Sequence, residues 1–171
     1  MLLSASSAFG ALMLQGAEGL PTGSADPGTS ITLNLKSDIP IAGCGIALVA
    51  DKPGLTVTAV TYPQEHWQST AFPLPLPASM DPPGTSDLGG NSIVDTGANV
   101  NVVTFTIDLG TAAPGVYTIS SVADTVYWYD AAGILFEVGD ASPFTLTITP
   151  EPTSMLLLAA GSLLFARRRR A

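Results

Sequence analysis

The sequence holds little charge and few of the side chains that enzymes and nucleic-acid-binding proteins depend on. Of its 171 residues 12% are charged, one is Cys and one is His, against about 25% charged residues in an average soluble domain. The low charge excludes a charge-rich disordered protein and a coiled coil, and the single Cys excludes a disulfide scaffold. Only six residues are Lys or Arg, too few for a basic surface that binds nucleic acid.

The charges divide the chain into an acidic body and a basic end. Residues 1–150 carry 13 Asp and Glu against Lys36 and Lys52, whereas residues 151–171 carry Glu151 against four Arg. The 46% of apolar residues and the overall length allow one domain with a sizeable core.

The C-terminal end places three elements in a fixed order. Pro150-Glu151-Pro152 comes first, the apolar run 155–166 follows, and four Arg residues at 167–170 come last. Leu and Ala favour a helix here, and adjacent Arg residues stay on the cytoplasmic side of a membrane. A helix over 153–166 is about 21 Å long, short of a hydrocarbon core of about 30 Å. The sequence therefore predicts a C-terminal hydrophobic helix that anchors the chain transiently.

This tail, residues 150–171, resembles the PEP-CTERM sorting signal of Gram-negative envelope proteins. The motif is Pro150, Glu151 and Pro152, and the cytoplasmic basic tail is Arg167, Arg168, Arg169 and Arg170. The resemblance implies recognition by exosortase, a membrane-embedded cysteine protease that acts near the motif, and an association with exopolysaccharide and biofilm systems. It also implies export across the inner membrane, transient membrane anchoring, and a final place at the outer surface or outside the cell.

Export of this kind needs a signal peptide. Residues 1–8 are largely apolar and end in Ser6-Ser7-Ala8, with small residues where a signal peptidase cleaves, but they lack a positive n-region. Either the true start codon lies upstream and residues 1–8 are the remnant of a signal peptide, or residues 1–14 are the whole of one. We adopt the first interpretation, which leaves residues 10–15 as a first strand.

Short alternating runs predict an all-β domain over residues 9–149. Residues 31–36 and 103–108 alternate apolar with polar side chains, and Gly, Pro, Asp and Asn separate the runs. Outside the tail, no 3.6-residue apolar pattern lasts for ten residues. We predict an antiparallel β-sandwich of about 8–9 strands, of the Ig-like or jelly-roll type.

The order of these runs resembles cohesin-like and related carbohydrate-binding-type sandwiches over most of residues 10–149. The segments that carry the resemblance are 37–43, the turn 50–55 and the run 114–119. It implies a sandwich whose sheet face and nearby loops bind a partner module or a glycan.

Two tryptophans are candidate ligand-binding residues. Trp67 lies in a Pro-rich insertion at 62–99, whose run 73–77 favours polyproline II, and Trp128 lies between two Tyr in a predicted strand. An exposed indole could stack on a sugar ring. Alternatively Trp67 covers an open end of the core with Phe72, and Trp128 packs in the core or at its rim.

The string at 93–100 resembles the active-site strip of retropepsin-like aspartic proteases. Asp95-Thr96-Gly97 follows two apolar residues, and in that family each of two subunits supplies one Asp of a pair that shares a proton. Residues 89–92 leave too little strand to hold a rigid carboxylate, and no partner strand is visible. Asp95 is therefore an alternative, and we predict a protein that is not an enzyme.

The sequence offers few residues for any other catalytic site or metal site. His66 and Cys44 are each the only residue of their kind, which leaves no standard zinc set and no helix start to activate a thiolate. Calcium is the cofactor alternative, because Asp124, Asp130 and Asp140 flank late turns that could meet at one end of a sandwich. Otherwise we predict no cofactor.

Together these observations predict an exported, non-enzymatic component of the cell envelope that acts in a biofilm matrix, in adhesion, or in binding a glycan or protein. Its expected partners are an exosortase-type protease, the membrane through the C-terminal helix, and an extracellular polysaccharide or protein, but not nucleic acid. The alternatives are an aspartic protease that uses Asp95 and a purely structural surface protein.

Overall fold

Three β-sheets and no helix make up the part of the chain that the computed structural model describes, residues 12–69 and 76–150, with the backbone alone at 136–139. The strands, in chain order, are β1 (Leu12–Gly16), β2 (Thr22–Ala25), β3 (Ser30–Ser37), β4 (Gly43–Gly45), β5 (Leu48–Ala50), β6 (Thr56–Thr61), β7 (Gln68–Ser69), β8 (Ala78–Ser79), β9 (Gly90–Asn91), β10 (Val100–Asp108), β11 (Gly115–Ser121), β12 (Val126–Tyr129), β13 (Leu135–Gly139) and β14 (Phe144–Ile148).

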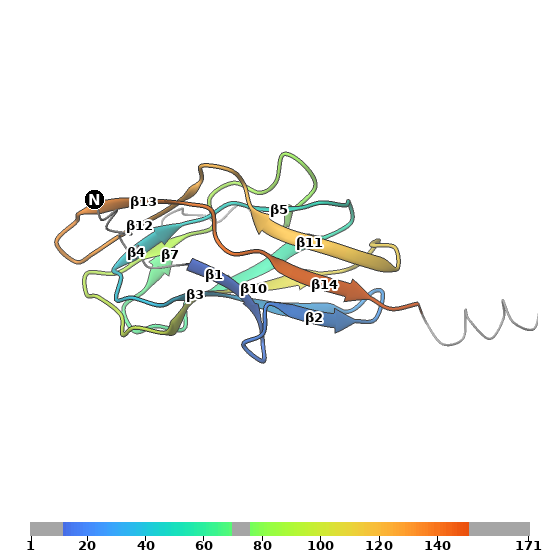
Figure 1. The fold of residues 1–171 in the computed structure, drawn as a ribbon, viewed down its shortest axis with the longest axis horizontal. Helices are drawn as coiled ribbons and strands as arrows, with labels where there is room; N and C mark the ends of the chain where they lie inside the picture. The colour runs from blue at the N-terminus through green and yellow to red at the C-terminus, as the bar shows by residue number, and fades with distance from the viewer. Residues whose placement is uncertain (1–11, 70–75, 151–171) are drawn as a thin grey trace, which may run out of the picture.

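The sheets divide the molecule along its long axis. The first sheet has the order β1-β3-β10-β6-β8, the second β2-β14-β11-β5, and the third β13-β12-β4-β9-β7. The third sheet lies toward one end, and β14 runs out at Pro150 toward the other (Figure 1). The predicted helix at 153–166, the signal-peptide remnant at 1–8 and Phe72 lie outside the described residues.

The prediction of an all-β sandwich is confirmed, with two corrections. First, the sandwich is not wholly antiparallel, because β2 pairs with β14 in parallel. Second, the strands are shorter and more numerous than expected. For example, β4 and β5 are separate short strands that belong to different sheets. At this break the N–H groups of Ile46 and Leu48 donate to Asp87 Oδ1 and Thr85 Oγ1 instead of to a strand. Side chains thus satisfy the backbone where the ladder stops.

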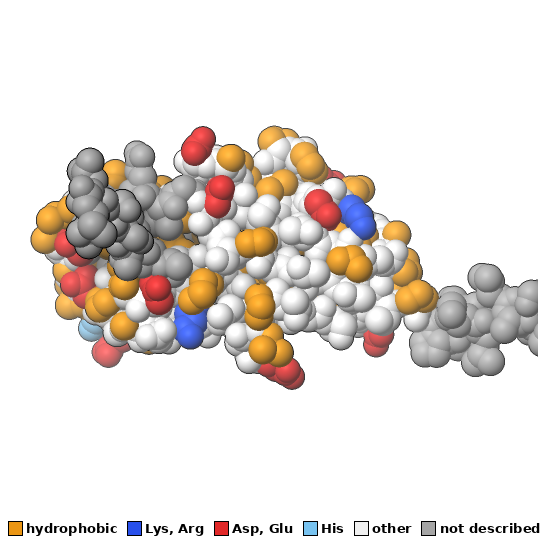
Figure 2. Space-filling view, in the orientation of Figure 1, with side chains coloured by type: hydrophobic (Ala, Val, Ile, Leu, Met, Phe, Trp, Pro, Cys, Tyr) orange, Lys and Arg blue, Asp and Glu red, His pale blue; other side chains and the backbone are white. Residues whose placement is uncertain are grey.

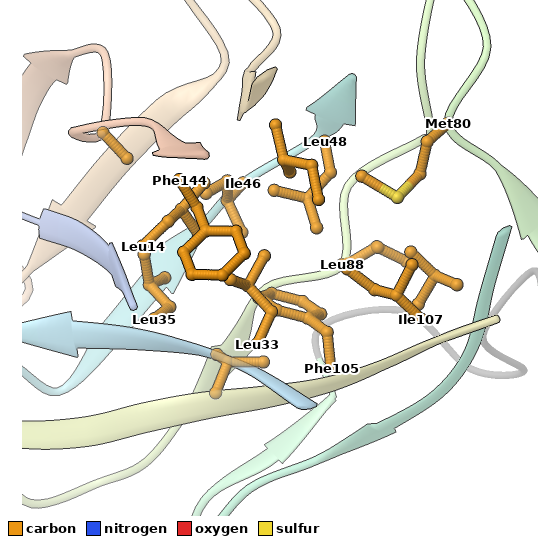
Figure 3. Packing of buried hydrophobic residues seen from close by; sticks show 14 of the residues in the cluster. Leu14, Leu33, Leu35, Ile46, Leu48, Met80, Leu88, Phe105, Ile107 and Phe144 are labelled. Carbon is orange, nitrogen blue, oxygen red and sulfur yellow. The ribbon is translucent and has the colours of Figure 1, made fainter. Parts of the chain in front are cut away.

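One core joins the inner faces of the sheets. Alternation along β3 and β10 turns Leu33, Leu35 and Phe105 inward, and all three are fully buried. Figure 3 shows these side chains together with Phe144 of β14 and Ile46. Burying each such side chain contributes roughly 1.5–3 kcal/mol, so the alternating runs supply the main stabilisation.

The segment expected to be an insertion, residues 62–99, runs along the sandwich where it is described. Its described residues, 62–69 and 76–99, contain only the two-residue strands β7, β8 and β9. Met80 and Leu88 are fully buried, and Leu88 N–H donates to the carbonyl of Ile46 at 2.8 Å. The insertion therefore contributes to the core and completes the edge of the third sheet.

Candidate functional site

The third sheet turns two tyrosines outward. Along β12, Val126 and Trp128 are buried, whereas Tyr127 and Tyr129 are half-buried. The period of two along a strand places the two pairs on opposite faces. The outer face of β12 is therefore aromatic.

Glycines face these tyrosines from the neighbouring strand. Tyr129 pairs with Gly43 and Tyr127 with Gly45, in antiparallel register. A Cβ atom on Gly43 would overlap Cζ of Tyr129, and one on Gly45 would overlap Cε1 of Tyr127. Only glycine at both positions lets the rings lie across β4.

The strand register extends this arrangement into a row across the whole sheet. Tyr129 pairs with Leu135 on β13, Gly43 pairs with Asn91 on β9, and Asn91 pairs with Gln68 on β7. Directly paired residues in an antiparallel sheet share a face. We call the outer face formed by Leu135, Tyr129, Gly43, Asn91, Gln68, Tyr127 and Gly45 the tyrosine face.

Asp87 braces the tyrosine face at Tyr127. The Tyr127 hydroxyl donates to Asp87 Oδ2 at 2.9 Å, while Asp87 Oδ1 accepts from the N–H groups of Ile46 at 3.1 Å and Gly89 at 2.8 Å. Burial, followed by the bond to Asp87 and its negative charge, raises the pKa of Tyr127 to about 12. The phenol therefore stays a neutral donor that fixes the ring.

Exposed apolar side chains border the tyrosine face at the tip of the molecule. Ile93 is 88% and Leu135 59% exposed, and Val94 and Ile134 are also exposed. The two loops that carry them are tied together, because Asp95 Oδ1 accepts a hydrogen bond from Ala131 N–H at 2.8 Å. In Figure 2, hydrophobic side chains gather at this end of the molecule.

The two candidate tryptophans do not stand at the surface. Trp67 is 8% and Trp128 6% exposed, and both belong to the hydrophobic core. This burial agrees with the core-packing alternative, whereas stacking on a sugar ring needs an exposed indole. In this run the sequence-based candidate was Trp128, whereas the residues that glycines support on the outer face are Tyr127 and Tyr129. Their signal is the spacing itself, Tyr-Trp-Tyr opposite Gly-Cys-Gly.

The geometry around Asp95 does not resemble an aspartic protease site. The residue lies in an exposed loop between β9 and β10, and Oδ1 is engaged by Ala131 N–H. The neighbouring Thr96 exchanges hydrogen bonds with the backbone of Ile41. Asp95 and Thr96 thus hold the loop in place, and the exposed Asp95 lacks the enclosed setting in which a carboxylate pair shares a proton.

Cys44 and His66 do not have the surroundings of a catalytic nucleophile and its base. Cys44 is fully buried on the inner side of β4, and burial raises the pKa of its thiol to about 12. His66 is exposed, with Nε2 3.6 Å from Glu65 Oε1. A buried neutral thiol is unreactive.

The calcium candidates Asp124, Asp130 and Asp140 do not come together in the structure. Among the residues whose side chains are described, no three Asp, Glu, His or Cys gather as a metal site. Asp130 Oδ1 instead accepts from the N–H groups of Ala132 and Ile134. Asp130 thus orders its turn, as expected where the chain reverses direction, and Asp140 Oδ1 accepts from the Ser121 hydroxyl at 3.4 Å.

A groove of about 600 Å³ lies between β2, β3 and β14. Phe144 packs against Gly23, where a Cβ atom would lie 2.9 Å from its Cζ. Glu18 is the one charged residue among those that line the groove, and Thr32 and Ser24 add hydroxyls. No pair of reactive groups converges there.

The sorting motif begins where the described residues end. Thr149 and Pro150 follow β14, whereas Glu151, Pro152 and Arg167–Arg170 lie outside the described residues. Within residues 12–69 and 76–150, no helix is long and apolar enough to cross a membrane. Residues 149–170 match the family model of the PEP-CTERM protein-sorting motif, which implies sorting by exosortase and export to the cell envelope or surface.

Solved structures of cohesin modules share the fold of the body. A cohesin module of a family 33 glycoside hydrolase from Clostridium perfringens has a TM-score of 0.61 at 9% identity, covering 83% of this chain and 98% of that one. A type II cohesin domain from the cellulosome of Acetivibrio cellulolyticus has a TM-score of 0.52 at 12% identity, covering 80% and 94%. The third cohesin of ScaC from the same organism, solved with the ScaB dockerin, has a TM-score of 0.51 at 9% identity, covering 80% and 99%. No curated protein matches the sequence.

Proposed function

We propose that this chain is an exosortase-sorted surface protein whose body is a non-catalytic binding module, with the tyrosine face as its binding surface. One observation carries the proposal. The tyrosine face lies toward the end of the molecule away from Pro150, where the sorting motif begins (Figure 1). A body anchored transiently by its C-terminal tail would present this end to its surroundings, and once the tail is cleaved the tyrosine face would retain the protein at the cell surface.

The composition of the face supports binding. Tyr127 and Tyr129 are large, rigid and half-buried, and side chains of this kind contribute strongly to interfaces at a small entropy cost. Asp87 holds one ring in position before any partner arrives, which lowers the ordering cost of association.

The fold comparison supports the same class of function. One of the similar structures is a cohesin in complex with a dockerin, so this sandwich can serve as a protein-binding module. At 9% identity the likeness concerns the fold, and function depends on the site. A role in a biofilm matrix or in adhesion would follow from the partner that the tyrosine face holds.

The test of the binding function uses the full-length chain in an exosortase-containing host. Cells produce the original sequence, the double variant Tyr127→Ala/Tyr129→Ala, or Val116→Ala, an exposed residue of β11 on the second sheet. We expect all three proteins to be exported equally and only the double variant to pass from the washed cell surface into the medium. Equal retention of all three would show that the tyrosine face is not the binding surface.

The sorting function has its own test. Intact mass of the exported protein should show loss of Arg167–Arg170, because exosortase acts near Pro150-Glu151-Pro152 in proteins with this signal. In a host without exosortase the four Arg should remain. A full C-terminus on all exported protein in both hosts would refute processing.

A further inference from the structure

We propose that the tyrosine face binds a polysaccharide that carries free amino groups. The proposal rests on the binding function above and specifies the chemistry of the partner. Three features of the face carry it, namely its rings, its carboxamides and its charge.

The rings offer an apolar platform of fixed shape. Tyr127 and Tyr129 are two residues apart on β12, about 7 Å along the strand, and both lie across β4 where Gly43 and Gly45 leave room. A pyranose ring has an apolar face of C–H groups that stacks on an aromatic ring. Two such rings in line along a strand can contact successive sugars of one chain.

The carboxamides offer hydrogen bonds beside this platform. Asn91 and Gln68 continue the row beyond Gly43. Neither side-chain amide has a hydrogen bond to another residue within 12–69 and 76–150. A carboxamide both donates and accepts, which suits the paired hydroxyls of a sugar.

The charge around the face is negative. Asp87 contacts Tyr127, while Asp95 and Asp130 hold the tip beside Leu135. The two lysines of the described body lie elsewhere. Lys36 is in β3 of the first sheet, and Lys52 follows β5 and lies 5.4 Å from the centre of the Tyr117 ring.

Charge complementarity therefore selects among glycans. Carboxylates attract ammonium groups and repel uronates, sulfates and phosphates. An ammonium group also interacts favourably with the face of a tyrosine ring. A polysaccharide with free amino groups satisfies the rings, the amides and the carboxylates together, and an uncharged chain satisfies only the first two.

The experiment compares three β-1,4-linked hexasaccharides that differ only at the second carbon of each sugar, namely those of glucosamine, N-acetylglucosamine and glucose. Binding to the full-length protein is measured by calorimetry at about pH 5.5, where the amino groups of the glucosamine hexamer are protonated, and at low salt. We expect the glucosamine hexamer to bind about tenfold tighter than the glucose hexamer, and added salt to remove the difference.

Variants separate stacking from charge. Tyr129→Ala should weaken all binding by about tenfold, whereas Tyr129→Phe keeps the ring and should retain it. Asp95→Asn keeps the acceptor for Ala131 N–H and should weaken only the glucosamine hexamer, by about threefold. Asp108→Asn is the matched control, because Asp108 Oδ1 accepts from Gly110 N–H at the end of β10, and it should change nothing. Thermal melting checks that each variant is folded.

Each result decides the proposal. Equal affinity for the glucosamine and glucose hexamers overturns the selection for amino groups. If no hexamer binds while Tyr127→Ala/Tyr129→Ala still releases the protein from cells, the glycan is overturned and a protein partner takes its place on the same face. If no hexamer binds and the double variant is also retained, the proposed binding function fails as well.

Discussion

Replacing Gly45 by Ala should displace the Tyr127 ring, because the new Cβ would overlap Cε1 of that ring. The Tyr127 hydroxyl would then lose its 2.9 Å bond to Asp87. A hydrogen bond to a charged group contributes about 1.5–3 kcal/mol, while Ala in place of Gly in a strand offsets about 0.5–1 kcal/mol. We therefore expect Gly45→Ala to lower the free energy of unfolding by about 1–2 kcal/mol.

The assay is a double-mutant cycle in urea. In a Tyr127→Ala background the overlap is gone, so Gly45→Ala should there be neutral or slightly stabilising, which gives a coupling energy of at least about 1 kcal/mol. Gly97→Ala is the control, because its Cβ would lie at an ordinary 3.7 Å from Val100 Cγ1. In Gly45→Ala the pKa of Tyr127 should also fall from about 12, as followed by ultraviolet titration. If Gly45→Ala costs the same with and without the Tyr127 ring, the ring does not lie on Gly45.

Three further predictions concern groups outside the tyrosine face. Burial raises the pKa of Cys44 from its ordinary 9.0 to about 12, so its stability contribution is complete below pH 9 and is lost as pH rises toward 12. At pH 10 the loss should be about 1 kcal/mol, and Cys44→Ala should remove it in pH-dependent urea unfolding. Asp95→Ala should lower the free energy of unfolding by about 0.5–1.5 kcal/mol through the lost bond to Ala131 N–H. The unaltered protein should cleave no peptide at acid pH. Cleavage that Asp95→Asn abolishes would contradict the binding-module account. Calcium should leave the melting temperature unchanged, and a rise that Asp130→Asn removes would show a site that the fold does not predict.

The fold class could be predicted from the sequence because strands of a sandwich alternate with a period of two. Residues 31–36 and 103–108 show this period, and they form the centre of the first sheet as β3 and β10. The break between β4 and β5 could not be predicted in the same way. It depends on Asp87 and Thr85, which are distant in sequence and satisfy backbone groups of Ile46 and Leu48.

The candidate site could be predicted only in part. The sequence puts Trp128 between two Tyr in a predicted strand, and a period of two then sets it on the face opposite to them, but which face is buried depends on the partner strand. Cys44 is buried beside Trp128, so Gly43 and Gly45 face outward with the tyrosines. The place of Trp67 stayed open between surface and core for a related reason. Its ring lies in the core although residues 62–99 look like a surface loop in the sequence, because parts of this segment pack as edge strands.

Hydroxyl-radical footprinting on intact cells that produce the full-length chain tests the central claim most directly. The protein should be labelled from outside the cell. When the extracellular matrix is stripped away, labelling should rise at Tyr127, Tyr129 and Leu135 and stay constant at Val116 and Leu20, which are exposed away from the tyrosine face. No labelling would contradict export, and an equal change at all five residues would contradict a binding surface on the tyrosine face.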